Sequence, residues 1–272
     1  MIIRPGKIAL SALMSLILIG MLSPLVYMVT ASLRDVFSPA SLIGIFSGNL
    51  TLANYKEVFA GGRMTLFVLN SLLVAAVVTA ANIVFCLMTG YALARKRFFG
   101  SKALFYSATA ILMIPQHVVI IPVFILISWL GMYNTYWALI LPWLVNPLGV
   151  FLMKQYISNL PDDCEQAARI DGAGEFTILF KIVMPLCKPA LAVLAVQVFL
   201  TNWNSFLYPF ILTSSTELYT LPVGLAMMQG LQQMELGRLM AGSTIAALPV
   251  IIVFLFFQRQ ITEGITAGAV KG

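Results

Sequence analysis

Five long segments of this sequence contain no Asp, Glu, Lys or Arg. They are residues 8–32, 64–94, 103–153, 189–216 and 239–258. A helix needs about 20 predominantly apolar residues to cross the hydrocarbon core of a bilayer, and each of these runs is long enough. Only 10% of the chain is charged, whereas a soluble domain has roughly 25% charged residues. The sequence therefore predicts an all-α, polytopic membrane protein.

The third charge-free run is too long for a single crossing. It is interrupted at Leu130–Asn134, a turn-like stretch whose glycine favours a turn and whose tyrosine suits a membrane interface. This run therefore predicts two helices, which brings the predicted total to about six. All of them belong to one transmembrane domain that covers residues 1–272. We expect the spans at about 8–31, 66–94, 103–127, 136–153, 189–213 and 239–258.

The basic residues are divided unequally between the two sides of the predicted membrane. Twelve of the 16 lie on one side, namely Arg4, Lys7, Arg95, Lys96, Arg97, Lys102, Lys154, Arg169, Lys181, Lys188, Arg259 and Lys271. The other side holds Arg34, Lys56, Arg63 and Arg238. The positive-inside rule then predicts that both termini are cytoplasmic. The net charge of +6 is thus a topology signal and does not favour nucleic-acid binding.

The first run follows two basic residues, as the core of a secretory signal does. It is longer than the 7–15 apolar residues typical of that core, which favours an uncleaved first helix. The three cysteines show no spacing typical of a disulfide or a metal site. The outside segment 33–63 predicts a small extracytoplasmic cap that contacts a soluble partner, although a packed loop fits the same residues.

The inside connection 154–188 concentrates charge, because it holds five of the ten acidic residues. Asp162 is placed to cap the N-terminus of a short helix, with Glu165 three residues later completing a capping box. Gly172 is placed to end that helix in the left-handed conformation. A helix of this length is marginal alone in water, so it must pack on something.

A second helix is expected from Glu175 to about Met184, where Pro185 ends it. Its side chains at positions 176, 179, 180 and 183 are apolar and are predicted to share one face. The connection therefore forms a helix-turn-helix finger in the cytoplasm. The residues alone leave open whether the finger contacts a partner or only covers the inner surface of the helical bundle.

The finger carries a recognisable motif. Glu165-Gln-Ala-Ala-Arg-Ile-Asp-Gly-Ala173, followed by Ile182-Val-Met-Pro185, resembles the EAA loop of the inner-membrane permeases of bacterial ABC importers. Asn49–Phe59, Asn70-Ser71 and Gly264–Gly272 are similar to other segments of the carbohydrate branch, in particular of the subunit type of the MalG component of the maltose transporter. Gln166 departs from the motif, which usually has a second Glu there.

This resemblance implies a multi-pass permease of the bacterial inner membrane that couples ATP hydrolysis to sugar import. The finger would seat on a cytoplasmic ATPase subunit through Glu165, Gln166, Ala167, Ala168, Asp171, Gly172 and Pro185. The implied partners are a second homologous permease, two ATP-binding subunits, an extracytoplasmic sugar-binding protein and membrane lipid. The chain itself would be non-catalytic, with no cofactor or metal, because the ATPase subunits would use the ATP and magnesium. In agreement, the sequence has no Gly-x-x-x-x-Gly-Lys-Ser/Thr loop.

Several polar residues lie within the predicted spans, where they are candidates for a substrate path. They are His117, Asn146, Asn202, Asn204 and Tyr208. Amides next to aromatic rings suit sugars, but hydrogen bonds between helices use the same residue types, so both interpretations remain open. Pro115 and Pro122 flank His117 and are expected to kink the third span.

Two other classes of protein compete with the importer hypothesis. A stand-alone carrier or channel would need no ATPase subunit, but ion-coupled carriers commonly place Asp, Glu or Lys in their spans, and these spans have none. A membrane enzyme would need a nucleophile beside a base, and the only histidine, His117, has no acidic residue near it in the sequence.

Overall fold

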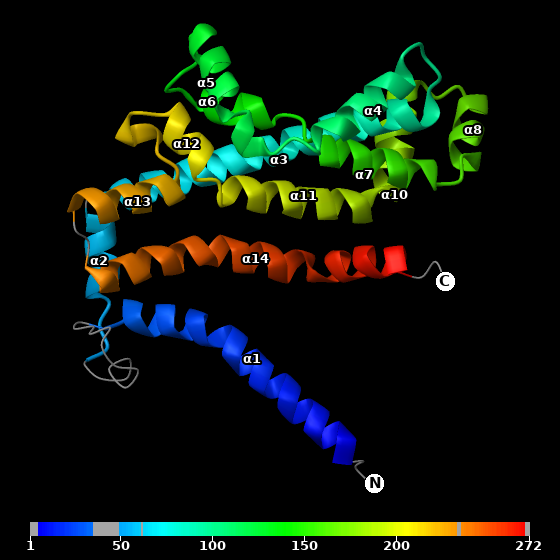
Figure 1. Ribbon diagram of the computed structural model, residues 1–272. Helices are drawn as coiled ribbons and strands as arrows, with labels where there is room; N and C mark the ends of the chain where they lie inside the picture. The colour runs from blue at the N-terminus through cyan, green and yellow to red at the C-terminus, as the bar shows by residue number, and fades with distance from the viewer. Residues whose placement is uncertain (1–4, 35–48, 61, 233–234, 270–272) are drawn as a thin grey trace. The chain divides into compact units, whose positions relative to one another are not determined.

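The computed structural model describes residues 5–34, 49–60, 62–232 and 235–269 (Figure 1). Every regular element among them is a helix, and one isolated antiparallel bridge joins Arg34 to Leu50. The all-α prediction is confirmed. The chain divides into two compact parts, residues 1–66 with 224–249 and residues 67–223 with 250–272.

The first part contains α1 (Pro5–Ser32), α2 (Ala53–Ala60) and the beginning of α14 (Leu236–Ala269). Asn54 joins α2 to the end of α1, because its amide donates to the carbonyls of Ser32, at 3.0 Å, and Arg34, at 2.8 Å. A Cβ atom at Gly237 would lie 2.8 Å from the Nδ2 atom of Asn54, so α14 approaches α2 closely at a glycine. Helix α2 thus forms the packed part of the predicted cap, of which residues 35–48 lie outside the described range.

The second part is organised around three helices, α3 (Arg63–Arg95), α7 (Pro147–Ser158) and α11 (Lys188–Trp203) (Figure 1). Their buried side chains form one apolar core that includes Val78, Leu87, Met153, Ile157 and Leu194. The shorter helices in this part are α4 (Ser101–Ile111), α5 (Ile120–Trp129), α6 (Tyr136–Ile140), α8 (Asp163–Ile170), α9 (Glu175–Ile178), α10 (Met184–Leu186), α12 (Leu207–Leu212) and the first residues of α13 (Leu221–Gln232).

Two glycines allow these helices to pack closely, and at Gly90 the neighbour is backbone. A Cβ atom at Gly90 of α3 would lie 2.6 Å from the Cβ of Met153 and 2.9 Å from the backbone nitrogen of Lys154. At Gly149 of α7, a Cβ atom would lie 2.7 Å from the Cδ1 of Leu194 in α11. Small residues at such crossings are typical of helices that pack within a membrane, where close van der Waals contact drives association.

Four helical stretches are long and apolar enough to cross a membrane. They are Leu10–Ser32, Arg63–Arg95, Tyr136–Ser158 and Leu236–Gln258. A fifth is present if Glu175–Leu186 and Lys188–Trp203, which meet at 82°, are counted as one broken span. By length and composition the described residues therefore support four or five crossings, which roughly matches the prediction of about six.

The predicted span 103–127 is not one continuous helix. Helix α4 ends at Ile111, a 3-10 turn covers Gln116–Val118, and α5 begins at Ile120. Pro115 lies in this break with an extended backbone, at ψ 128°, and it has no N–H to continue the helical hydrogen bonds. The expected kink at Pro115 is thus a complete interruption.

The predicted span 189–213 is also divided, because α11 ends at Trp203 and α12 starts at Leu207. Pro209, in the first turn of α12, has no N–H to donate to the carbonyl of Ser205, so the helical hydrogen-bond pattern is not continued from α11 into α12 at this residue. The amide of Asn204 donates to the carbonyl of Leu200 at 2.9 Å and satisfies one of the last backbone acceptors of α11.

We predict that Gly90→Ala destabilises the protein by about 1–3 kcal/mol, because the Cβ of Met153 and backbone atoms of Met153 and Lys154 occupy the space that a methyl group needs. The measurement is the midpoint of thermal unfolding of the purified chain in detergent. Gly20→Ala is the matched control, since a Cβ atom at Gly20 of α1 meets nothing within 4 Å. Equal midpoints for the two variants would contradict the close packing.

Candidate functional site

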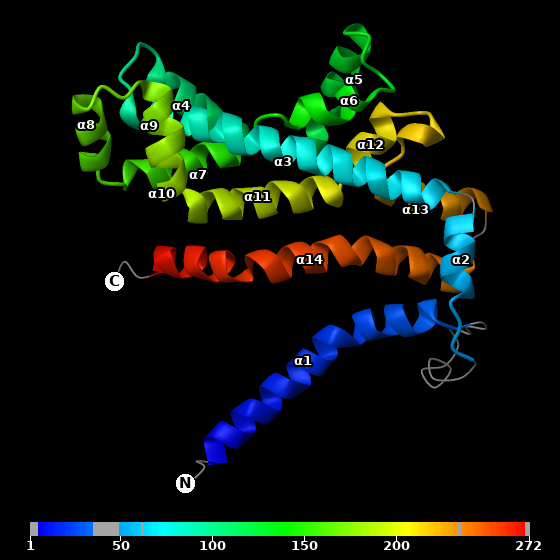
Figure 2. The same ribbon diagram turned by 180° about the vertical axis from the view of Figure 1, so that it is seen from behind.

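Helix α8 of the predicted finger lies between α7 and α9 in the chain and beside the C-terminal end of α3 (Figure 2). It ends at Ile170, and Gly172 follows in the left-handed conformation with φ 81°. The N–H of Ala173 donates to the carbonyl of Ala168 at 2.9 Å, which closes the helix end. The predicted role of Gly172 in the turn is confirmed.

The predicted capping box is wrong. Asp162 precedes α8 with a backbone near the helical region, at φ −91° and ψ −1°, and its side chain makes no capping hydrogen bond. A capping side chain reaches the next turn from an extended backbone, which Asp162 does not have. Its carboxylate instead accepts a hydrogen bond from the Nε2 atom of Gln166 at 2.8 Å.

Glu165 points inward instead of back to the helix start. Its side chain is only 3% exposed, and its Oε1 atom lies 2.8 Å from the Nε atom of Arg95 at the end of α3. Arg95 also donates from Nη2 to the carbonyl of Leu160 at 2.8 Å. A buried carboxylate requires a partner of opposite charge, and here the partner comes from a residue 70 positions earlier in the chain.

A second acidic residue, Glu175 at the start of α9, joins the same network. Its Oε1 atom lies 2.5 Å from the Nζ atom of Lys96, and this hydrogen bond lowers the pKa of Glu175. The hydroxyl of Tyr91 lies 3.0 Å from Glu175 and 3.3 Å from Glu165. Arg169 lies 3.5 Å from both carboxylates.

We call these six residues the anchor network: Tyr91, Arg95, Lys96, Glu165, Arg169 and Glu175. It holds the two short helices of the finger against the end of α3. Of these six residues only Glu165 was a predicted site residue, because local spacing gives no sign that α3 ends beside α8. The basic run Arg95–Arg97 was the one sequence feature that could have indicated partners for these acidic residues.

The predicted coupling residues fall into two groups on α8. Glu165 is buried and Ala168 packs against the apolar core. Gln166, Ala167, Asp171 and Gly172 are exposed, as is Pro185 in α10. Ile170 is an exposed apolar side chain on the same helix, at 87% of its accessible area. The helix thus has a fixed inner face and a free outer face that includes an isoleucine.

The side chains predicted to share one face of the second helix do not do so. Leu179 and Val183 are buried, whereas Phe176 and Phe180 are exposed. Residues Leu179–Val183 form a π-helix, whose wider turn changes the angle between successive side chains. The prediction assumed the α-helical period throughout.

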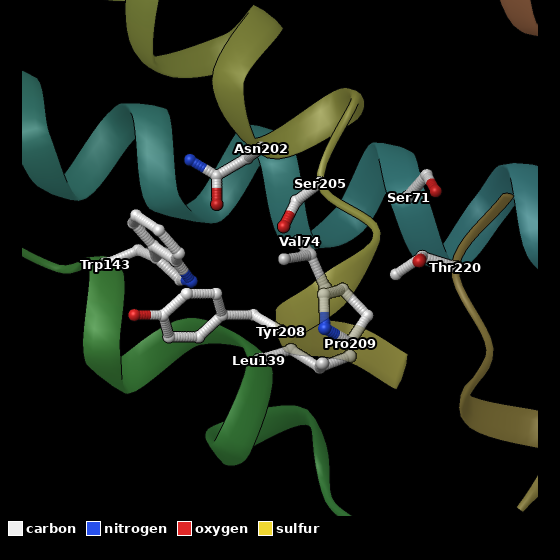
Figure 3. Close-up of a pocket in the computed structure, with 9 residues that line it drawn as sticks. All are labelled: Ser71, Val74, Leu139, Trp143, Asn202, Ser205, Tyr208, Pro209 and Thr220. Atoms are coloured by element: carbon white, nitrogen blue, oxygen red, sulfur yellow. The ribbon is translucent and has the colours of Figure 1, made fainter. Parts of the chain in front are cut away.

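Two of the predicted path residues, Asn202 and Tyr208, line one small cavity of about 10 Å³, enough for about one water molecule (Figure 3). The rings of Tyr208 and Trp143 meet edge to face with centroids 4.8 Å apart. The hydroxyl of Tyr208 donates to the carbonyl of Gln116 at 2.9 Å. Thr220 also lines this cavity, and its buried hydroxyl has no hydrogen-bond partner among the described residues.

The other path candidates do not converge on this cavity. Asn146 caps α7 by accepting from the N–H of Leu148 at 2.9 Å, and its amide donates to Gln197 at 3.1 Å. Asn204 is exposed, and His117 is exposed in the 3-10 turn before α5. A structural role is therefore visible for Asn146, and the proposed contact of all five residues with substrate remains a prediction.

We predict that Arg95→Gln increases local opening of α8, because the change removes the nearest counter-charge of the buried Glu165 and leaves only Arg169, at 3.5 Å, among the described residues. Removing one partner of a buried pair costs about 3–5 kcal/mol. The measurement is amide hydrogen exchange of residues 163–173 in the purified chain. Arg97→Gln is the control, since Arg97 is exposed and has no ion pair within the described part of the chain. Equal exchange in the two variants would show that the anchor network does not hold α8.

We also predict that Gly172→Ala loosens the end of α8 by about 1–2 kcal/mol, the cost of a side chain in the left-handed conformation. Gly174→Ala is the matched control, because Gly174 has an ordinary φ of −74° and both positions have open space around a Cβ atom. Exchange at Asp171 and Ala173 reports the effect. If both variants behave alike, backbone conformation is not what requires the glycine.

Comparison with known proteins supports one family. Residues 83–266 match the family described as "Binding-protein-dependent transport system inner membrane component". The arabinooligosaccharides transport system permease protein AraQ of Halalkalibacterium halodurans is 39% identical over 92% of this chain and 91% of its own length. The trehalose/maltose transport system permease protein MalG of Thermococcus litoralis is 33% identical over 92% of each chain.

The fold is found in a solved structure as well. A chain in the crystal structure of a bacterial ABC transporter involved in the import of alginate is similar with a TM-score of 0.80. It is 20% identical, and the match covers 95% of this chain and 99% of that one. From the family match and these relatives, this chain is an inner-membrane component of a binding-protein-dependent transport system.

Proposed function

We propose that the chain is a permease subunit of an ATP-driven importer of sugars or sugar oligomers, and that it forms half of the translocation pathway. The relatives named above transport arabinooligosaccharides, trehalose and maltose, which supports a carbohydrate as the substrate class. The proposed partners are a second homologous permease, two ATP-binding subunits and an extracytoplasmic binding protein. Both termini would be cytoplasmic, and the chain would hydrolyse no ATP itself.

One observation carries the proposed coupling role of α8. The inner face of this helix is fixed to α3 by buried charges, while its outer face is exposed and carries Ile170. A free apolar side chain on a rigidly held, otherwise polar helix is suited to a groove on a soluble partner. An ATPase subunit that grips the outer face would then move α3 through Glu165 and Arg95.

The path from the finger into the second part of the chain is short. Helix α9, the π-helix and α10 follow α8, and the chain then bends by 82° into α11. Leu179 and Val183 of the π-helix belong to the same buried core as Met153 of α7 and Leu194 of α11. A displacement of the finger would therefore be transmitted to α3 through the ion pairs of the anchor network. It would be transmitted to α7 and α11 through the apolar core.

We predict that Ile170→Asp reduces co-purification of the ATPase subunit by at least about tenfold, because it places a charge in the proposed apolar contact. ATP-dependent sugar uptake in vesicles should fall in parallel. The permease should still fold, since the residue is exposed. Co-purification from mild detergent, followed by quantitative blotting, measures the effect.

Leu52→Asp is the matched control, an exposed leucine outside the finger that receives the same charge. It should leave the amount of bound ATPase unchanged. If Ile170→Asp and the wild type retain equal ATPase, α8 is not the contact. If the wild type purifies alone and transports without ATP, the importer proposal is wrong and a stand-alone carrier replaces it.

A further inference from the structure

A groove of about 530 Å³ is lined by residues from the C-terminal end of α3, the first turns of α4 and the C-terminal half of α7. Its charged lining is almost entirely basic. The residues are Arg95, Lys96, Arg97, Lys102, Lys154 and a single acid, Asp162. Basic residues from three separate helices and one loop therefore surround one hollow. The positive-inside rule requires only that such residues lie on the same side of the membrane, and does not require that they gather at one place.

Part of this charge is already neutralised by the anchor network. Arg95 pairs with Glu165 and Lys96 pairs with Glu175. Within the described residues no acidic side chain forms an ion pair with Arg97, Lys102 or Lys154. Three cations without an ion pair thus remain around the hollow against the one carboxylate of Asp162, and the ligand that suits this excess of positive charge is an anion.

The surroundings of the groove are apolar and aromatic. Phe99 is fully exposed and Phe98 is partly exposed in the turn between α3 and α4, directly after the basic run. Tyr106 lines the groove and is largely exposed, and the Nζ atom of Lys154 lies 4.7 Å from the ring centroid of Phe105. Basic residues close to exposed aromatic side chains are typical of a membrane interface.

Helix α4 extends this apolar surface away from the groove. None of its residues is buried, and Leu104 and Ile111 are about half exposed. An acidic patch on a soluble partner would match the cations but would leave this apolar stretch uncovered. A phospholipid matches both, because its phosphate meets the cations while its acyl chains follow the apolar helix.

We propose that this groove binds the head group of an anionic phospholipid, with Lys102 and Lys154 as its principal contacts and α4 along the acyl chains. Arg97 contributes from the loop. The site lies beside the anchor network and shares Arg95 and Lys96 with it. The proposal does not depend on sugar transport, since it concerns only binding to the permease chain.

The test is native mass spectrometry of the full-length purified chain, released from micelles that contain equal amounts of phosphatidylglycerol and phosphatidylcholine. Phosphatidylglycerol should be retained in preference. The double variant Lys102→Gln/Lys154→Gln should lower its apparent affinity by at least about tenfold, because each basic residue near an anionic surface contributes about fivefold. Arg97→Gln, a change in an exposed loop, should lower it by about fivefold on the same basis.

Lys181→Gln/Lys188→Gln is the matched control, because both lysines are exposed and neither lines the groove. It should change the affinity by less than about twofold. An equal loss in this control would indicate diffuse surface charge, and equal retention of phosphatidylcholine would indicate ordinary annular lipid. Displacement of the lipid by millimolar glycerol 1-phosphate would identify a site for soluble anions. Each of these three results would overturn the proposal.

Discussion

The arrangement of the finger depends on the burial of one carboxylate. Glu165 lies almost completely out of solvent, so its charge must be matched, and its closest counter-charge is the guanidinium of Arg95 at 2.8 Å. Because Arg95 also binds the carbonyl of Leu160, the same side chain fixes the segment that leads into α8. Tyr91 and Arg169 then connect this pair to Glu175. A two-turn helix that is too short to persist alone is stabilised in this way by contacts with a much longer one.

Features that depend on local chemistry were predictable from the sequence. The charge-free runs predicted an all-α membrane protein, and Gly172 was assigned to a left-handed turn that it does occupy. Pro115 indicated a disturbance in the third span, but spacing alone did not show that the helix stops there. Features that depend on distant residues were not predictable. Asp162 and Glu165 have the spacing of a capping box, yet the nearby guanidinium of Arg95 offers Glu165 a stronger partner than a backbone N–H.

The roles of the candidate substrate residues also depend on distant parts of the chain and could not be predicted from the sequence. Amides and aromatic rings in a span are compatible with a sugar path and with internal hydrogen bonds, and only the fold separates the two. Asn146 has a clear structural task as the cap of α7, whereas Asn202 and Tyr208 share a cavity with room for about one water molecule. The π-helix is another feature without a sequence signature, since Leu179–Val183 fit an α-helical pattern equally well.

The glycine contacts between α3, α7 and α11 have a consequence for motion. Where Gly90 meets the backbone at Met153 and Lys154, no layer of flexible side chains separates the helices, so sliding would require the contact to break. Helices α3 and α7 would consequently move as one rigid body during a transport cycle. The freedom to change shape would then lie at the interruptions, residues 112–119 and 204–206, where the α-helix is not continuous. These two interruptions would be the hinges of the permease, and the close glycine contact would be a rigid part of it.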